Sequence, residues 1–440
     1  YRISEEAFFE PLRKTVDNLK IRLSYGSLGN QQIGYYDFIQ TITTKGSMGD
    51  YSFDGTILGQ HATVSDPVSG NQTWEKVISK NLGADLNMFS NRLSLTADFY
   101  IRDTKGILGK GKSLPSIYGA NEPQVNSNNL RTKGYELVLG WRDSFKLAGS
   151  TFSYGITGTF SDYTAEYTKC DNPSGLIGDP YVGKKYGEIW GYKVDGLFRN
   201  DEEAAEYASR VDLSKVAAGY YSATGAYGKG VRGGDIKYLD LDGSGIVDGG
   251  KGTLEDPGDR RVIGNSSPRY QYGLTLNLSW YGFDLSVFMQ GIGRLDWYPG
   301  ADNLRFWGPY SRPYATFIPK NFMSQVWSES NPDAYLPRAR AYTSLNSTQG
   351  TAYYTNDRYL QNLAYCRLKN LTLGYTIPKR LTSKVGIKEC RVYFSGENLA
   401  TWSALKNDFL DPEQAAADSD KKSNVYPWCR TYSVGLNLTF

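Results

Sequence analysis

Hydrophobic and polar residues alternate with a period of two along much of the chain, as in strands with one apolar and one polar face. Between Tyr270 and Trp280 the even positions are tyrosine, leucine or tryptophan, and the odd positions are polar residues or glycine. Residues 431–440 repeat this pattern up to the final aromatic residue, Phe440. Residues 93–101, 135–141, 152–156 and 283–289 follow it too. Each segment predicts a strand of roughly 9 to 11 residues, the length that crosses a membrane at a tilt.

Alternation alone leaves open a soluble β-sandwich, whose polar face meets water. The connections favour a membrane barrel, because short links alternate with long loops. Short links are expected near residues 89–91, 143–146, 281–282 and 378–388, and long loops near 28–72, 104–127, 168–260, 294–359 and 404–426. We therefore predict an all-β fold, a transmembrane antiparallel β-barrel with about ten strands in residues 1–440, with Phe440 and the short links on the periplasmic side.

The beginning of the chain predicts further sequence upstream. Residues 5–16 place apolar side chains at nearly helical spacing, so a short amphipathic helix is expected there. Tyr1–Ile3 would then be the stub of an earlier strand, and the chain opens without an initiator Met or a secretion signal. Since open strand edges are not tolerated in lipid, closing the barrel requires strands from missing sequence or from a companion chain.

Composition agrees with an all-β membrane protein. Mean hydropathy is −0.48, and no stretch approaches the apolar length of a membrane helix. The 35 Tyr, 18 Phe and 9 Trp include Trp280, Trp402 and Trp428 near predicted strand ends, where interfacial aromatic girdles form. A formal charge of +3 without a basic run argues against nucleic acid as a partner. The four cysteines are widely spaced, which is compatible with one or two disulfides but not with a zinc motif.

Four segments resemble one known family. They are Leu19–Gly26 with Gly29-Asn30-Gln31, then Asp259–Asn265 with Pro268 and Tyr270, then Gly396–Trp402, and finally Gly435–Phe440. In this order they are similar to the SusC/RagA family of TonB-dependent outer-membrane transporters. The similarity covers nearly the whole chain, so it is more specific than any one motif.

The resemblance implies a barrel of about 22 strands, of which this chain supplies the C-terminal part. It also implies an N-terminal plug inside the barrel and a TonB-contacting segment, neither of which has a counterpart in this sequence. A SusD-like surface lipoprotein is the implied partner at the extracellular mouth. The implied activity is import of oligosaccharide, or alternatively oligopeptide, across a Gram-negative outer membrane.

An acidic loop suggests a metal site. Asp240, Asp242, Ser244 and Asp248 supply oxygens at positions 1, 3, 5 and 9, with the Ile246 carbonyl at position 7 and a glycine at position 6. This spacing is similar to an EF-hand loop and predicts Ca²⁺, or Mg²⁺, as a structural ion. Lys251 stands where the bidentate glutamate is expected, so Glu255, Asp256 or Asp259 would have to replace it. The competing interpretation is a plain Asp/Gly-rich turn.

Five loop aromatics are candidates for ligand contact, because flat apolar rings complement the faces of sugars. They are Trp190, Tyr192, Trp297, Trp307 and Tyr310. The alternative role for each is packing within the loops. No catalytic constellation stands out around the single histidine, His61, so we expect a protein that is not an enzyme. Besides a transporter, the sequence leaves open a passive porin or adhesin-like barrel and a soluble carbohydrate-binding β-protein.

Overall fold

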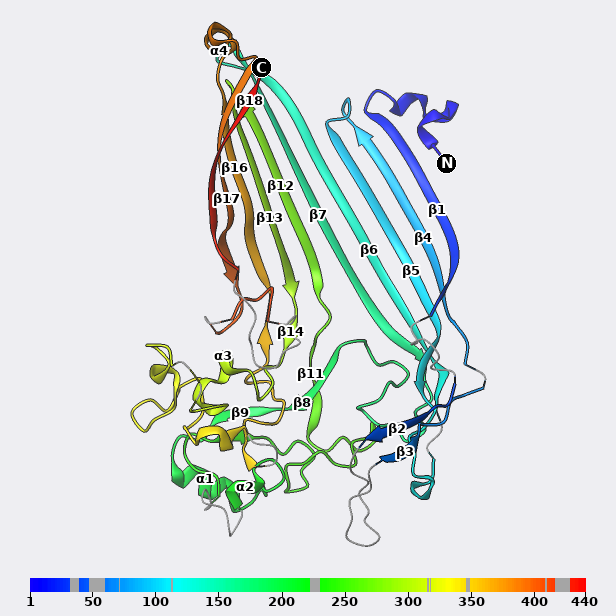
Figure 1. The fold of residues 1–440 in the computed structure, drawn as a ribbon, viewed down its shortest axis with the longest axis vertical. Helices are drawn as coiled ribbons and strands as arrows, with labels where there is room; N and C mark the ends of the chain where they lie inside the picture. Colours follow the sequence, from blue (N-terminus) through cyan, green and yellow to red (C-terminus); the bar gives the residue numbers. More distant parts are fainter. Residues whose placement is uncertain are drawn as a thin grey trace.

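The computed structural model describes residues 1–31, 39–46, 60–70, 72–111, 114–221, 230–314, 316, 318–345, 349–407, 410–415 and 428–440. Its main element is one ten-stranded antiparallel sheet in which neighbouring strands follow chain order (Figure 1). The strands are β1 (Val16–Asn30), β4 (Glu75–Met88), β5 (Leu93–Lys110), β6 (Gln124–Leu147), β7 (Ser150–Lys169), β12 (Arg269–Trp280), β13 (Phe283–Arg294), β16 (Tyr365–Thr376), β17 (Glu389–Ser403) and β18 (Thr431–Thr439). The predicted strand number and antiparallel arrangement are confirmed, and the described strands leave β1 and β18 as the edges of the sheet.

Short links lie at one end of the sheet together with the C-terminus, and long loops gather at the other end (Figure 1). The β12–β13 link is a two-residue turn in which Tyr281 and Gly282 have φ of 48° and 84°. Two successive positive φ values fit the twist of a tight hairpin, and glycine adopts one of them without strain. The link between β16 and β17 contains α4 (Lys379–Thr382) and η8 (Ser383–Val385).

Two boundary predictions were wrong. The link expected at residues 143–146 lies at Ala148–Gly149, because β6 and β7 continue their pairing through Phe145↔Phe152 to Leu147↔Ser150. Most strands are also longer than a membrane crossing requires, and β6 has 24 residues. The excess lies toward the loops, where the strands continue beyond the alternating apolar segments.

The expected N-terminal helix consists of two short 3₁₀ segments, η1 (Ile3–Glu5) and η2 (Ala7–Leu12). Pro11 lies inside η2, and its missing N–H is incompatible with a regular α-helix through this segment. The backbone of Tyr1 exchanges hydrogen bonds with Ile21, and Arg2 forms an antiparallel bridge with Lys20. The first residues therefore extend the sheet beyond β1, as the predicted strand stub would.

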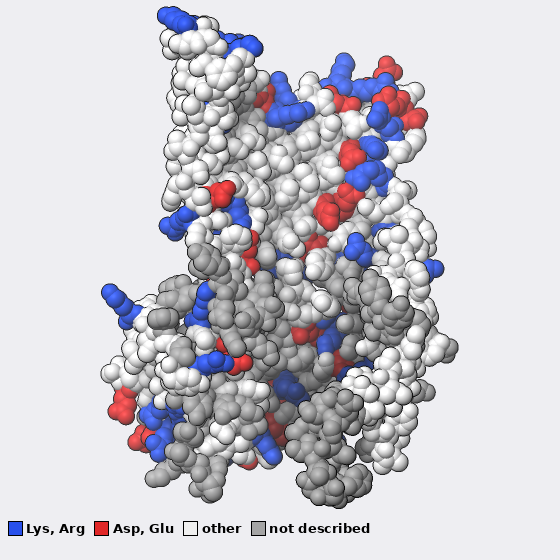
Figure 2. Space-filling view, in the orientation of Figure 1, with Lys and Arg blue, Asp and Glu red and all other residues white. Residues whose placement is uncertain are grey.

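The two faces of the sheet differ in polarity. The outward rows are apolar and exposed on the isolated chain, as shown by Leu274 at 42%, Leu436 at 58% and Val434 at 79%. Among the described residues no second sheet covers these rows, as a sandwich would require. The inner face carries ion pairs such as Arg22 with Asp85 and Asp98. Figure 2 shows acidic and basic side chains together over β1, β4 and β5 of the concave face.

The long loops contain the remaining elements. They are β2 (Ile42–Gly46), β3 (Gln60–Val64), η3 (Ser116–Tyr118), β8 (Glu188–Tyr192), β9 (Val194–Leu197), α1 (Asp201–Ala208), α2 (Ala218–Tyr221), β10 (Ile236–Tyr238), β11 (Arg260–Asn265), β14 (Asp296–Trp297), α3 (Leu304–Trp307), η4 (Gly308–Tyr310), η5 (Met323–Gln325), η6 (Ala341–Ser344) and β15 (Gln361–Asn362). No helix in the described ranges is long and apolar enough to cross a bilayer. Within the described part of the chain, Cys170, Cys366 and Cys390 are free thiols.

Candidate functional sites in the loops and on the inner wall

Two long loops fold into one body, which we call the loop assembly (residues 170–268 and 295–364). Its hydrophobic core draws side chains from both loops, including the fully buried Phe198, Leu213 and Tyr359. The loops also share backbone hydrogen bonds, since Tyr192 N–H donates to Thr355 O at 2.9 Å and Asp357 N–H donates to Tyr192 O at 3.1 Å. The assembly therefore has the packing of a small domain at the long-loop end of the sheet (Figure 1).

A buried asparagine lies at the centre of this packing. Asn356 is fully buried, and its amide donates to the Tyr298 hydroxyl at 3.1 Å and the Tyr354 carbonyl at 2.8 Å. Its side-chain oxygen accepts the Tyr359 N–H at 3.1 Å. A buried amide with both ends satisfied fixes the surrounding backbone in one arrangement.

A buried ion pair joins the same two loops. Asp235, which is 1% exposed, accepts a hydrogen bond from Arg340 at 2.6 Å, and the Arg340 guanidinium lies 4.0 Å from the Tyr220 ring centroid. Burial outweighs the attraction of Arg340 and raises the pKa of Asp235 to about 6. Neither residue stood out in the sequence, because charged residues in loops are usually solvated.

The structure places the five candidate aromatics inside or at the border of the loop assembly. Tyr192, Trp307 and Tyr310 are 6%, 0% and 2% exposed. Rings with so little free surface cannot stack on a ligand in this arrangement, so ligand contact is corrected to packing for these three. Burial accordingly raises the pKa of Tyr192 to about 12. Trp190 in β8 and Trp297 in β14 are partly exposed, and their ligand contact stays a prediction.

The acidic loop has two of its predicted carboxylates in place. Oxygens of Asp240, Asp242 and Asp259 lie within 4.8 Å of one another. Asp240 also accepts hydrogen bonds from Gly243 N–H at 2.8 Å and Gly245 N–H at 2.9 Å, which curls the loop around its carboxylate. Of the three residues considered as replacements for the missing glutamate, Asp259 is the one that the fold brings here.

The other predicted ligands, Ser244, Ile246 and Asp248, make hydrogen bonds within the loop. Ser244 Oγ donates to the Ile246 carbonyl at 3.0 Å, and Asp248 Oδ1 accepts from Gly250 N–H at 2.7 Å. Asp259 is fully buried, and burial raises its pKa, although N–H groups of Leu241 and Asp248 donate to its carboxylate. Three carboxylates around one point suit a hard cation such as Ca²⁺, whose positive charge would offset their mutual repulsion.

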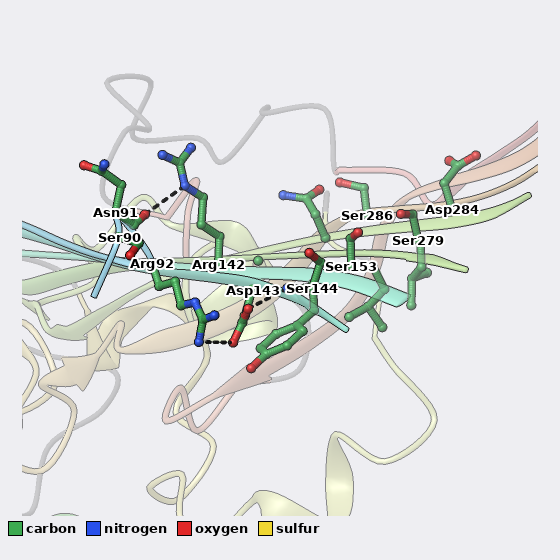
Figure 3. A pocket seen from close by; sticks show the side chains of 15 residues that line it. Ser90, Asn91, Arg92, Arg142, Asp143, Ser144, Ser153, Ser279, Asp284 and Ser286 are labelled. Carbon is green, nitrogen blue, oxygen red and sulfur yellow. Dashed lines mark hydrogen bonds and ion pairs between the residues drawn. The ribbon is translucent and has the colours of Figure 1, made fainter. Parts of the chain in front are cut away.

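The inner wall carries polar side chains from several strands. One pocket of about 660 Å³ is lined near the short links by residues of β6, β7, β12 and β13. Figure 3 shows Arg142, Ser286 and Asp284 on one face of the sheet, and Arg92 and Asp143 on the opposite face. A second pocket of about 420 Å³ lies nearer the loops, with Glu136, Gln271 and Gln290 among its lining residues. Both offer hydrogen-bonding groups to a polar solute.

An arginine on the inner wall holds the last long loop. Arg367 in β16 is 1% exposed and donates to Glu413 at 2.6 Å, to Asp411, and to Thr401 at 2.9 Å. Lys369 adds a second contact with Glu413 at 2.8 Å. The described residues 410–415 are thereby fixed against the barrel wall. No local pattern in the sequence marks this cluster, because the acidic partners of Arg367 lie more than forty positions away along the chain.

Comparisons with known proteins agree with this architecture. The chain is 26% identical over 463 residues to TonB-dependent receptor P3 of Formosa agariphila, and 21% identical over 460 residues to TonB-dependent receptor SusC of Bacteroides thetaiotaomicron. All of this chain is covered, together with 41% and 39% of those proteins. Its fold matches the structure of the RagAB peptide transporter with a TM-score of 0.69 at 21% identity, covering 42% of that chain. No family model matches the sequence.

The antiparallel sheet, its outward apolar rows and these matches define the chain as part of the wall of an outer-membrane-type β-barrel. The described residues form strands and loops of that wall and no plug domain. More specifically, the chain is similar over its whole length to the C-terminal part of TonB-dependent receptors, SusC among them, which is the resemblance that the four sequence segments predicted. It spans about two fifths of the length of the relatives that it matches.

Proposed function

We propose that the intact protein imports oligosaccharide across the outer membrane of a Gram-negative bacterium, with energy supplied through TonB. The observation that carries this proposal is the change of polarity across the sheet, which gives one face to lipid and the other to a hydrated lumen. The relatives named TonB-dependent receptors support the TonB requirement. In this function the present chain supplies barrel wall, lumenal surface and extracellular loops.

A SusD-like surface lipoprotein is the partner that we propose for the loop end. A body with its own hydrophobic core offers a fixed docking surface, in contrast to independent loops. Co-purification of the full-length transporter from the native membrane tests this partner. Recovery of the transporter without any lipoprotein, under mild detergent, would argue against it.

Oligopeptide is the alternative substrate, and the fold match to the RagAB peptide transporter is the observation in its favour. Uptake of labelled oligosaccharides and of labelled peptides by cells with and without the full-length gene distinguishes the two. Uptake that survives loss of TonB would instead indicate a passive porin. A product that remains in solution without detergent would refute every barrel function.

For the acidic loop we propose a structural Ca²⁺ held by Asp240, Asp242 and Asp259. With Ca²⁺ bound, residues 240–260 of the full-length protein should resist protease, and a chelator should remove that protection. Asp240→Asn with Asp242→Asn should abolish the Ca²⁺ effect, whereas Asp302→Asn, at an exposed position of the same assembly, should preserve it. Identical digestion patterns with Ca²⁺ and with chelator would leave the loop as an ordinary turn.

A further inference from the structure

The outer face of β4, β5 and β6 changes from apolar to basic toward the loops. Cross-strand register places Leu23, Leu82, Phe99 and Tyr135 in one outward row. The next row toward the loops contains Tyr25, Lys80, Ile101 and Lys133, and the two rows after it contain Arg131 with Asp103 and Lys76 with Lys105. Four lysines thus point outward just beyond the apolar surface. We call Lys76, Lys80, Lys105 and Lys133 the basic patch.

The charge of the basic patch is only partly offset by neighbouring carboxylates. Asp103 lies near Lys80 and Lys105, but its carboxylate bonds to Arg131 at 2.6 Å. Within the described ranges, no ion pair involves any of the four lysines, and all four are exposed. Glu166 lies opposite Arg131 at the border. The patch therefore keeps a positive charge available to an outside partner.

A groove of about 710 Å³ adjoins the patch on the same face. Leu23, Leu82 and Phe99 are among its apolar residues, and Lys80 and Lys133 are among its charged ones. Ser24, Asn81, Tyr100, Gly134 and Tyr163 form an inward-pointing row in the middle of the lining. Outward rows flank this row on both sides, and the adjoining inner-face residues Arg22, Asp98 and Glu136 do not contribute, so the groove opens outward. Arg269 also contributes, although its charge is matched by Asp162. The combination is an apolar floor with a basic rim.

The height of the patch matches the edge of a membrane. On β6, the outward positions from Phe145 to Tyr135 cover about 33 Å of strand at about 3.3 Å per residue, and the one charged position among them, Asp143, is paired with Arg92 near the short links. At a tilt of about 40° this corresponds to about 25 Å across the bilayer, the usual height of the apolar band on an outer-membrane barrel. Lys133 follows Tyr135 as the next outward position. It therefore lies where lipid head groups begin.

The patch is confined to one side of the sheet. The outward positions nearest the loops on β13, β16 and β17 are Gly293, Cys366 and Trp402. None of these carries a charge. A general requirement for interfacial residues would distribute lysines around the whole wall, so the localisation indicates a specific contact.

We propose that the basic patch and its groove bind a phosphorylated lipid of the surrounding leaflet. The phosphate would lie between Lys80 and Lys133, and an acyl chain would lie over Leu82 and Phe99. A soluble phosphate would use the lysines but leave the apolar floor exposed, which is why a lipid is the occupant that fits both features. This inference rests on the membrane placement in the proposed function.

Lipid titration of the full-length transporter in neutral detergent tests the proposal by native mass spectrometry. The probes are phosphatidylglycerol and phosphatidylcholine with identical acyl chains. In the double variant Lys80→Gln with Lys133→Gln, phosphatidylglycerol affinity should fall roughly 30-fold, since each lysine near anionic lipid contributes about 1 kcal/mol. Phosphatidylcholine affinity should not change.

The matched control is Lys379→Gln with Lys384→Gln, which removes two exposed lysines at the short-link end and should leave both affinities unchanged. Circular dichroism and heat-modifiable migration confirm that each variant is folded. Equal phosphatidylglycerol affinity in the wild type and the Lys80/Lys133 variant would overturn the proposal. So would glycerophosphate competing as strongly as the lipid, because that result identifies a soluble-phosphate site. Solubility without detergent would refute the membrane placement itself, which is a separate result.

Discussion

Asn356 offers a direct test of whether the two long loops act as one body. Replacing it with alanine removes the amide that contacts Tyr238 of the first loop at 3.3 Å. It also removes the amide contacts with Tyr298 and Tyr354 of the second loop and the oxygen that accepts the Tyr359 N–H. All of these contacts lie in the core of the loop assembly, away from the inner and outer faces of the sheet. The change should therefore weaken the assembly while leaving the barrel wall intact.

The size of the effect follows from which groups lose their partners. The Tyr354 carbonyl keeps the Tyr298 hydroxyl as a donor at 2.9 Å, so it remains satisfied. The Tyr359 N–H loses the Asn356 oxygen, and a buried donor without a partner costs about 1–3 kcal/mol. The lost side-chain volume adds a cavity in a closely packed core. Together we expect the free energy of unfolding of the loop assembly to fall by about 2–4 kcal/mol.

Limited trypsin digestion of the full-length protein in detergent measures this change. If cleavage tracks the open population, sites in residues 170–268 and 295–364 should be cut at least tenfold faster in Asn356→Ala. Heat-modifiable migration of the barrel should be unaltered. Asn321→Ala, at an exposed position of the same assembly, should digest like the wild type. Cleavage of Asn356→Ala at the wild-type rate would refute the single-body interpretation.

Three further predictions address the wall, a buried charge and the last loop. Leu436→Arg, on the outward face of β18, should cost about 2–4 kcal/mol in the membrane and reduce the amount of inserted protein, whereas Asn437→Arg on the inner face should insert normally, as measured by membrane fractionation. The carboxyl of Asp235 has a folded pKa of about 6 against about 4 unfolded, so its contribution to stability is largest below pH 4 and is lost as the pH rises through 6. Thermal denaturation followed by tryptophan fluorescence should show that loss, and Asp235→Asn should show none of it. Arg367→Ala leaves Asp411 without its buried partner and Glu413 with Lys369 and Gln290 alone, so Glu-C protease should cleave after Glu413 faster than in the exposed control Arg380→Ala.

The strands could be predicted from the sequence because the alternation of apolar and polar residues within each strand reflects the different environments of its two faces. A residue such as Leu274 points outward whatever its distant partners are, so period-two alternation was sufficient to find the strands, and the alternation of short links with long loops favoured a barrel wall over a sandwich. The family segments, such as Gly396–Trp402, then indicated the kind of barrel. Strand ends were less accurate, since pairing through Phe145↔Phe152 depends on both strands and is invisible in either one alone.

The loop assembly could not be predicted in the same way, because its contacts join residues far apart in the chain. Asp235 and Arg340 are 105 positions apart, and neither has a local pattern that marks it as buried. Trp307 illustrates the opposite error, since an aromatic in a loop suggested ligand contact while the fold buries it completely. The acidic loop could be predicted in part. The spacing of Asp240 and Asp242 indicated a cation site from the sequence, but only the fold shows that Asp259 approaches them.

The shared core of the loop assembly also constrains which changes to one loop the fold tolerates. Residues 170–268 leave β7 and enter β12, and residues 295–364 leave β13 and enter β16, so four adjacent strands feed one packed unit. A substitution that shifts one loop also disturbs the other loop, because backbone hydrogen bonds such as the one between Tyr192 and Thr355 join them. Chimaeras that exchange a single loop with a relative should therefore misassemble, whereas exchanging both together should preserve the unit.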